Sequence, residues 1–321
     1  MLILSGDVLE KLLVPSEVVE AVAEAFAAYS RGETVTPART VMWVEGNWWG
    51  VMQSYVPGRG VGVKAVSVVS SNRARGLPTV NAAVLLMDHE TGLPLALLNG
   101  TILTAARTAA ACALSVKLMA PGSSGVMGII GTGFQARYIV RYLTHVFKVE
   151  KLLLHDIDAV QARSFAEYAR GLGIEDVVVC SNCEEVLRSS MIIVESTTSR
   201  KPVVLGRLLR PPVHVVSIGV TGPQNSTVDP ETVARSEVVV VDSLRSVLEE
   251  VADIRIPLEK GLVDRERIVE IGEIVAGRKR GRVGEGVTLF KSVGVAVQDT
   301  AVASLAYRKA REKGVGLEVE L

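Results

Sequence analysis

The sequence predicts an α/β protein that combines a Rossmann-type doubly wound parallel sheet with a second, α+β domain. Its 321 residues exceed the usual size of a single hydrophobic core, so two domains are expected. In the first third of the chain, apolar runs alternate with period two and short turns separate them, which is typical of an antiparallel sheet. Further along, near-continuous apolar runs alternate with helical segments, which indicates parallel strands buried on both faces.

The first domain is predicted to open with a helix and to continue as strands. The helix begins at Pro15 and Ser16, carries apolar residues at helical spacing and ends at Gly32. Turn-forming pairs such as Gly46-Asn47 and Pro57-Gly58 then separate the strands. The predicted strands are residues 40–44, 48–55, 61–69, 80–88 and 95–98.

The second domain is predicted to follow a long Ala-rich helix over residues 104–119. Six apolar runs then suggest the parallel sheet, namely residues 126–130, 151–155, 177–180, 191–195, 213–218 and 238–241. A last helix, residues 294–313, is expected to return to the first domain. The predicted domains are therefore residues 1–118 with 295–321, which would hold the substrate, and residues 119–294.

Composition excludes several classes of protein. Lys and Arg together number 35, as do Asp and Glu, so no positive field is available to hold a nucleic acid. The first residues form no basic leader, and no apolar run is expected to be long enough to span a membrane. Three cysteines favour a reducing compartment, and we expect a cytoplasmic protein. Cys180 and Cys183 have the spacing of a metal pair, but nothing completes a zinc set, so no metal is expected.

A glycine-rich turn predicts a dinucleotide site. The stretch from Gly131 to Ala136 reads GTGFQA and lies between a predicted strand and a predicted helix. Gly131 permits the tight turn, Gly133 lets the backbone approach a pyrophosphate, and Ala136 allows the helix to pack on the strand. Asp156 ends the next strand, where its carboxylate can accept hydrogen bonds from the ribose hydroxyls and would repel a 2′-phosphate. The cofactor is therefore expected to be NAD.

The chain resembles the ornithine cyclodeaminase and mu-crystallin family, which includes alanine dehydrogenase and ketimine reductase branches. The resemblance runs from about residue 37 to residue 304 and rests on residues 62–64, 76–79, 107–110, 131–136, 270–273 and 290–294, in this order and spacing. It implies an N-terminal substrate and dimerisation domain beside a Rossmann domain, and a homodimer formed through the first domain. It also implies an NAD-dependent oxidoreductase that acts on small amino or imino acids.

Three cations match the family's substrate-carboxylate and catalytic positions: Arg39, Lys64 and Arg107. Planar Arg side chains bind carboxylates through paired hydrogen bonds, which agrees with this implication. Arg39 has an alternative interpretation as a solvated strand residue. Lys64 lies in an otherwise apolar strand, where burial and neighbouring arginines would lower its pKa toward neutrality and let it exchange a proton with the substrate.

The resemblance places further residues around the cofactor and the substrate. The cofactor positions outside the glycine-rich turn and Asp156 are Thr79, Arg107, Thr197, Ile218, Gly219 and Ser292, and within the turn Phe134 and Gln135 join Gly131, Gly133 and Ala136. Val293 falls on a substrate position.

One catalytic position departs from the family. Cyclodeaminase and alanine dehydrogenase members carry an Asp where this chain has Thr221. A hydroxyl cannot act as a carboxylate base at neutral pH, nor bind an ornithine ammonium by charge. Reduction of a ketimine or cyclic imino acid needs only a hydride and one proton, so it tolerates this change. Imino acid reduction and alanine dehydrogenation thus stay nearly equal, ornithine cyclodeamination comes third, and a non-catalytic small-ligand binder remains an alternative of another class.

Overall fold

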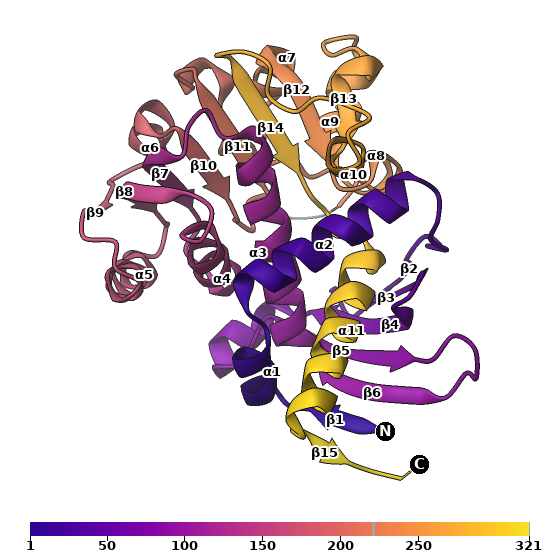
Figure 1. Cartoon of the computed structure of the whole chain (residues 1–321). Coiled ribbons are helices and arrows are strands. Elements are labelled where there is room, and N and C mark those ends of the chain that lie inside the picture. The colour runs from indigo at the N-terminus through magenta and orange to yellow at the C-terminus, as the bar shows by residue number, and fades with distance from the viewer. Residues whose placement is uncertain (220–221, 321) are drawn as a thin grey trace. The chain divides into compact units, whose positions relative to one another are not determined.

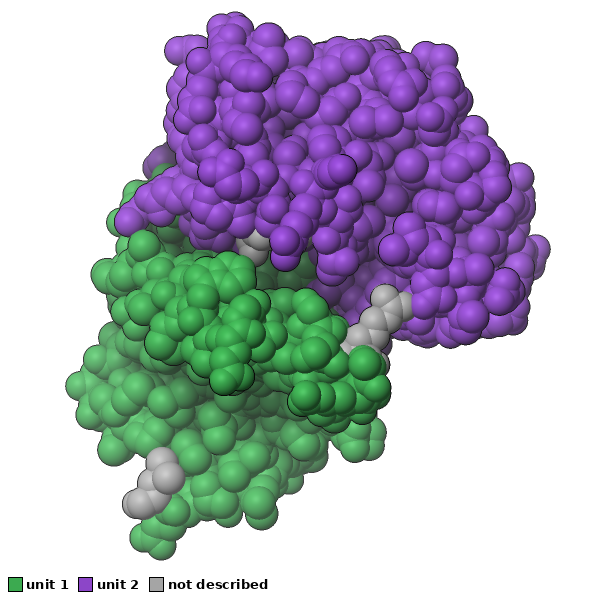
Figure 2. All heavy atoms as spheres, turned by 180° about the vertical axis from the view of Figure 1, so that it is seen from behind, with its two compact units in different colours: residues 1–110, 295–321 green, residues 111–294 purple. Residues whose placement is uncertain are grey.

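The computed structural model describes residues 1–219 and 222–320, so Thr221 lies outside the described residues. The chain forms two compact units, shown in different colours in Figure 2. Unit 1 comprises residues 1–110 and 295–321, and unit 2 comprises residues 111–294. The first boundary falls inside helix α3 (Gly100–Met119), and so does the boundary expected from the sequence after residue 118.

Unit 1 contains a seven-stranded sheet in the order β15-β1-β6-β5-β4-β3-β2. Its strands are β1 (Leu2–Leu4), β2 (Thr40–Val44), β3 (Asn47–Val56), β4 (Gly60–Val68), β5 (Val80–Met87), β6 (Pro94–Asn99) and β15 (Leu317–Glu318). Strands β2 to β6 form the predicted antiparallel meander. Strand β1 adds to β6 in parallel and pairs with β15 on its other side. The sequence did not predict β1 and β15, because two or three residues are too few to show a period.

Helices cover one face of this sheet. Besides the first part of α3, unit 1 contains the helices α1 (Gly6–Leu12), α2 (Pro15–Ser30) and α11 (Ala296–Lys313) and the 3-10 turn η1 (Ser70–Arg75). Helix α11 lies against β3 and β4, and α2 packs on α11 (Figure 1). A Cβ on Gly62 would lie 2.2 Å from the Thr300 hydroxyl, so this glycine is what allows β4 and α11 to approach so closely. The side chains between β4 and α11, including Lys64 and Asp299, are therefore buried.

Helix α3 corrects one expectation from the sequence. By length and composition it could cross a membrane, although no run of that kind was expected. However, 83% of its most apolar 18-residue window is buried inside the protein. The core helix of a globular protein meets the same criteria, because both environments favour apolar side chains all round the helix. We therefore describe α3 as a core helix.

Unit 2 contains an eight-stranded, fully parallel sheet in the order β13-β12-β14-β11-β10-β7-β8-β9. Its strands are β7 (Ser124–Ile130), β8 (Lys148–His155), β9 (Val177–Val179), β10 (Ile192–Glu195), β11 (Val213–Ser217), β12 (Ser236–Val241), β13 (Ile268–Glu270) and β14 (Val287–Lys291). The predicted fold class is confirmed, but the predicted number of six strands is wrong. Strand β13 is short, and Thr288 and Lys291 interrupt the apolar run of β14.

The strand order creates a switch point between β7 and β10. From β7 the chain proceeds outward through β8 and β9, then returns to β10 on the other side of β7. Ligands of such sheets bind outside the carboxyl ends of the strands at this point. A ligand is therefore expected to bind at the loops that follow β7, β10 and β11.

The connecting helices of unit 2 are α4 (Phe134–Leu143), α5 (Ala159–Gly171), α6 (Cys183–Ser189), α7 (Pro230–Arg235), α8 (Leu244–Glu250), α9 (Ala252–Glu259) and α10 (Ile271–Val275), with 3-10 turns η2 (Gly206–Leu208) and η3 (Arg265–Arg267). Asp158 caps α5 and Asn182 caps α6, as their positions before the helices predict. Because Asp158 caps α5, Asp156 is not needed for that role.

Candidate active site

The glycine-rich turn has the geometry that its sequence predicts. Gly131 follows β7 with φ +89°, and a Cβ there would lie 2.9 Å from the backbone oxygen of Ser196. Gly133 is the N-cap of α4, and a Cβ there would meet no heavy atom of the described residues within 4 Å, so the space beside its backbone is open. Ala136 is fully buried. Among the residues that the structure describes, none would block a phosphate from Gly133 at the amino end of α4.

Asp156 is fixed beside this turn. Its Oδ2 accepts hydrogen bonds from the Thr132 backbone N (2.7 Å) and hydroxyl (2.9 Å), and its Oδ1 accepts one from the Asp158 backbone N (2.9 Å). A carboxylate offers about four lone-pair sites, so a half-buried Asp156 keeps capacity for a ligand hydroxyl. The negative charge at the end of β8 is therefore held in place before any ligand arrives.

Two expected cofactor residues lie in the first turn of α4. Phe134 is 44% exposed and its ring lies 5.1 Å from that of Tyr138. The buried Oε1 of Gln135 accepts no hydrogen bond from the described residues. A buried carbonyl oxygen without a partner is costly, so this side chain suits a site where a ligand donates.

The loops after β10 and β11 meet on one buried carboxylate that the sequence reasoning missed. Glu195 ends β10 and is fully buried. Its Oε1 accepts from the backbone N (2.8 Å) and hydroxyl (2.7 Å) of Thr197, and its Oε2 accepts from the Gly219 backbone N at 3.1 Å. Ile218 donates its backbone N to the Glu195 carbonyl at 3.0 Å. The only signal in the sequence was an acidic residue closing an apolar strand.

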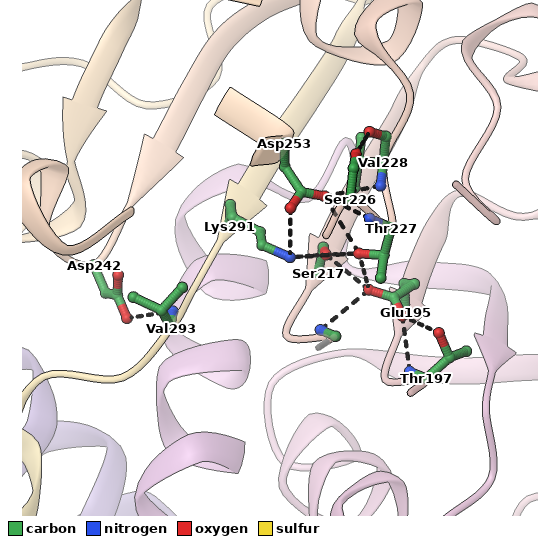
Figure 3. A network of polar contacts seen from close by, with 11 residues as sticks. Glu195, Thr197, Ser217, Ser226, Thr227, Val228, Asp242, Asp253, Lys291 and Val293 are labelled. Carbon is green, nitrogen blue, oxygen red and sulfur yellow. Dashed lines mark hydrogen bonds and ion pairs between the residues drawn. The ribbon is translucent and has the colours of Figure 1, made fainter. Parts of the chain in front are cut away.

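A second missed carboxylate fixes the segment after β14. Asp242, fully buried at the end of β12, accepts through Oδ2 from the Ser292 hydroxyl (2.7 Å) and from the backbone N of Val293 (2.9 Å) and Gly294 (2.6 Å). Figure 3 shows the contact between Asp242 and Val293. The structure therefore fixes Ser292 and Val293, two expected site residues, through one side chain.

In unit 1, Lys64 and Arg107 meet on the carboxylate of Asp299. Lys64 Nζ lies 2.7 Å from Asp299 Oδ2, and Arg107 Nε donates to Asp299 Oδ1 at 3.1 Å. Gln298 Oε1 accepts from Arg107 Nη1 at 3.3 Å. The side chains of Lys64 and Asp299 are 1% and 3% exposed. Asp299 was not predicted as a site residue, because it stands in a helix far along the chain from both of its partners.

Burial makes Lys64 a group that titrates near neutral pH. Its pKa is lowered to about 7, chiefly by desolvation and also by the positive charges of Arg107 and Arg39, while Asp299 acts in the opposite direction. Arg39 is half-buried and close enough to act on Lys64. Two cations, Lys64 and Arg107, thus share the carboxylate of Asp299, so an additional anion is electrostatically favoured here.

The predicted residues divide between the two units. Arg39, Lys64, Thr79 and Arg107 belong to unit 1, and the remaining described residues belong to unit 2. Thr79 is half-buried and its carbonyl accepts from the Val69 backbone N at 2.9 Å. The residues of unit 2 fit a dinucleotide, because an open turn at a helix amino end and a fixed acid are present together.

Comparison with known proteins identifies the family. The sequence profile of the ornithine cyclodeaminase/mu-crystallin family matches residues 1–314. Delta(1)-pyrroline-2-carboxylate reductase of Bacillus cereus is 36% identical, and the match covers 100% of both chains. Alanine dehydrogenase of Archaeoglobus fulgidus is 34% identical over 99% of this chain and 98% of its own. The solved Delta(1)-pyrroline-2-carboxylate reductase of Thermococcus litoralis, in complex with NADH and L-proline, is 43% identical with a TM-score of 0.95, covering 99% of this chain and 100% of its own. The resemblance seen in the sequence is confirmed, and the chain belongs to the ornithine cyclodeaminase/mu-crystallin family.

Proposed function

We propose that this chain reduces a cyclic imino acid of the Delta(1)-pyrroline-2-carboxylate class with NADH. It is an NAD-dependent oxidoreductase that acts on small amino or imino acids, and relatives at 36% and 43% identity carry the reductase name. The observation that carries the finer proposal is the buried cluster of Lys64, Asp299 and Arg107. It combines a proton donor that titrates near pH 7 with cations that suit a carboxylate.

The reaction joins one hydride and one proton to a carbon–nitrogen double bond. When bound, NADH would supply the hydride that forms the new C–H bond at the imine carbon. Lys64, in its ammonium form, gives a proton from Nζ to the imine nitrogen and is left as a neutral amine, which takes a proton back from water. A donor with a pKa near the working pH is suited to this exchange.

Arginine side chains hold the substrate carboxylate in this proposal. Arg107 is anchored by Asp299 and Gln298, so its planar group is ordered before the substrate arrives. Arg39 adds a second positive charge. A bound carboxylate would offset the excess of cations around Asp299 and favour the charged form of Lys64, which is the form that donates the proton.

The test is a comparison of substrates. NADH consumption is followed with Delta(1)-pyrroline-2-carboxylate, with its six-membered homologue and with pyruvate plus ammonia. We expect kcat/KM for a cyclic imine to exceed that for pyruvate plus ammonia by about 100-fold or more, because only the former arrives with its double bond made. NADH consumption with pyruvate and ammonia alone would contradict the proposal.

Alanine dehydrogenation is the second candidate. The relative from Archaeoglobus fulgidus carries that name at 34% identity. Against it stands Thr221, whose hydroxyl cannot serve as the carboxylate base of the dehydrogenase branch. Thr221→Asp should therefore raise alanine oxidation above the wild-type rate, and wild-type oxidation equal to that of the variant would favour this second candidate. The buried titratable lysine also favours catalysis over simple ligand binding.

A homodimer is part of the proposal. The face of the unit 1 sheet opposite α11 is apolar and open, with Met42 55%, Trp49 42% and Val51 36% exposed. A groove of about 430 Å³ runs over these residues and Ala65 and Ala83. A solved structure that matches the whole chain at 34% identity is described as an alanine dehydrogenase dimer, so a second copy is the occupant we propose. Sedimentation of Val51→Glu as a monomer, beside a dimeric wild type, would support it, and a monomeric wild type would refute it.

A cytoplasmic location is also proposed. Cys112, Cys180 and Cys183 are free thiols, and thiols persist in reducing compartments. Burial raises the pKa of the Cys180 and Cys183 thiols, which keeps them in the less reactive protonated form. Fractionation that places the protein outside the cytoplasm would contradict this proposal.

A further inference from the structure

We infer that Glu195 is the positioning residue for the nicotinamide side of the cofactor site, because its single carboxylate ties together the loops that follow β10 and β11. This inference rests on the proposed function, since it assumes that NADH binds at the carboxyl edge of the unit 2 sheet. It adds a residue to which the sequence reasoning gave no role.

Glu195 is saturated with donors from both loops. Besides Thr197 and Gly219, the hydroxyls of Ser217 and Thr227 donate to its Oε2, each at 2.8 Å. Thr227 lies beyond the loop after β11, so the contacts reach from the end of β10 to the start of the segment before α7. Figure 3 shows these side chains converging on the carboxylate. Five donors on one buried group fix its position more firmly than any one of them would.

The carboxylate excludes a side chain at Gly219. A Cβ there would lie 2.4 Å from both oxygens of Glu195, so only glycine allows the loop after β11 to close on it. The loop after β10 is tied to the glycine-rich turn as well, because the Ser196 hydroxyl donates to the Gly131 carbonyl at 2.8 Å. The three loops of the switch point are therefore linked, with Glu195 joining the second to the third.

Lys291, on the neighbouring strand β14, and Asp253, in helix α9, complete the network. Lys291 Nζ donates to the Ser217 hydroxyl at 3.0 Å and pairs with Asp253 Oδ2 at 3.4 Å, and both charged side chains are fully buried. Because Lys291 donates to Ser217, the single hydroxyl proton of Ser217 is directed at Glu195. The lysine thus orients a donor toward the carboxylate and offsets part of the buried negative charge.

The position of the network assigns it to one half of the cofactor. A doubly wound sheet has two mononucleotide-binding halves. Asp156 and the glycine-rich turn belong to the half formed by β7, β8 and β9, which suits the adenosine and the phosphates. Thr197 and Gly219 follow β10 and β11 in the other half, which leaves the nicotinamide side to the loops that Glu195 holds.

The test compares two ligands that share the adenosine half. The dissociation constants of NADH and ADP-ribose, which lacks nicotinamide, are measured for the wild type and for Glu195→Gln. In the glutamine side chain an NH2 group replaces one carboxylate oxygen, so a hydrogen-bond donor would face the donors that now bind Glu195. We therefore expect NADH to bind about tenfold more weakly or worse, and the affinity for ADP-ribose to change less than about twofold. A general loss of structure would weaken both ligands alike.

Two further variants provide a matched control and a replacement in case Glu195→Gln does not fold. Thr288→Val removes a buried hydroxyl that contacts His214 and Arg282. Thr288 lies near the amino end of β14, whereas Glu195 lies at the carboxyl end of β10, so this variant should leave the ratio of the two constants unchanged. If Glu195→Gln does not fold, Ser217→Ala removes one of the five donors and should change the ratio by about threefold. An unchanged ratio in the folded Glu195 or Ser217 variant overturns the inference. Failure of the wild type to bind NADH would instead overturn the proposed function.

Discussion

In unit 1, two cations share one carboxylate: Lys64 and Arg107 both contact Asp299, and Arg39 adds a further positive charge. In unit 2, two buried carboxylates, Glu195 and Asp253, share Lys291 through hydroxyls and one ion pair. The first cluster has two cations on one carboxylate and a lysine whose pKa lies near neutrality, and we propose that an anionic ligand binds there. The second has its excess negative charge met by backbone and hydroxyl donors. We therefore propose that buried charges form a ligand site in one unit and a structural support in the other.

The largest expected effect comes from breaking the support. Lys291→Met should lower the free energy of unfolding by about 3–5 kcal/mol, because it leaves Asp253 buried without its ion-pair partner. Urea denaturation measures the change. Lys151→Met is the control, since the pair of Lys151 with Asp176 is 40% and 52% exposed and its loss should cost less than about 1 kcal/mol. Equal effects of the two variants would show that the Lys291 network is not a support.

Removing the Lys64 ammonium group should lower catalytic activity and leave folding and cofactor binding unchanged. Lys64→Met should lower kcat/KM for the cyclic imine by about 100-fold or more, the range typical of a lost general acid. NADH affinity should survive, because the glycine-rich turn and Asp156 belong to unit 2. Lys11→Met, an exposed lysine of the same unit, should act as wild type. Full activity of Lys64→Met would make Lys64 a structural residue.

A third buried titratable group, His214, differs from both clusters because burial keeps its imidazole neutral. Desolvation and then the charge of Arg282 lower the pKa of His214 from 6.5 to about 3. The unfolded chain binds a proton below pH 6.5 and the folded one does not, so this contribution to stability is present above pH 6.5 and is lost as the pH falls toward 3.

Between pH 7 and pH 5 the wild type should therefore lose about 2 kcal/mol more unfolding free energy than His214→Gln. Urea denaturation at the two pH values measures it. His145→Gln, which changes an exposed histidine, should keep the wild-type dependence. The same dependence in His214→Gln would contradict a neutral buried imidazole.

The smallest expected effect concerns cofactor choice. Asp156→Ser removes the charge that opposes a 2′-phosphate while keeping a short acceptor, so the preference for NADH over NADPH should narrow by about tenfold. Binding titrations with the two cofactors measure it. A wild type that binds NADPH more tightly than NADH would refute the role given to Asp156.

Much of this fold could be predicted because its elements carry local signals. The meander from β2 to β6 shows period-two alternation, and the turn from Gly131 to Ala136 has a fixed spacing between strand and helix. Strand β14 escaped prediction although it lies inside the parallel sheet, because Thr288 and Lys291 interrupt its apolar run. Those polar residues are buried through partners on other strands, which no local pattern contains.

The site was predictable only in part for the same reason. Lys64 is conspicuous in an apolar strand, and Arg39 and Arg107 follow from the family resemblance. Asp299 meets Lys64 across a sequence separation that only the packing of α11 on β4 removes. Glu195 and Asp242 bind loops through backbone N–H groups, which every residue has, so their partners leave no mark in the sequence. Residues proposed to contact a ligand were therefore easier to find than the residues that hold them in place.

The most direct test of the central claim is the pH dependence of kcat/KM for the cyclic imine in the wild type and in Asp299→Asn. Asp299 raises the pKa of Lys64 against burial and the arginines, so its loss should lower that pKa. If Lys64 is the proton donor, activity falls as the pH rises past its pKa, and this fall should move to lower pH in Asp299→Asn. The titration of the substrate is common to both enzymes and cancels in the comparison. A fall at the same pH in both would contradict the assignment of Lys64 as the acid that Asp299 holds ready.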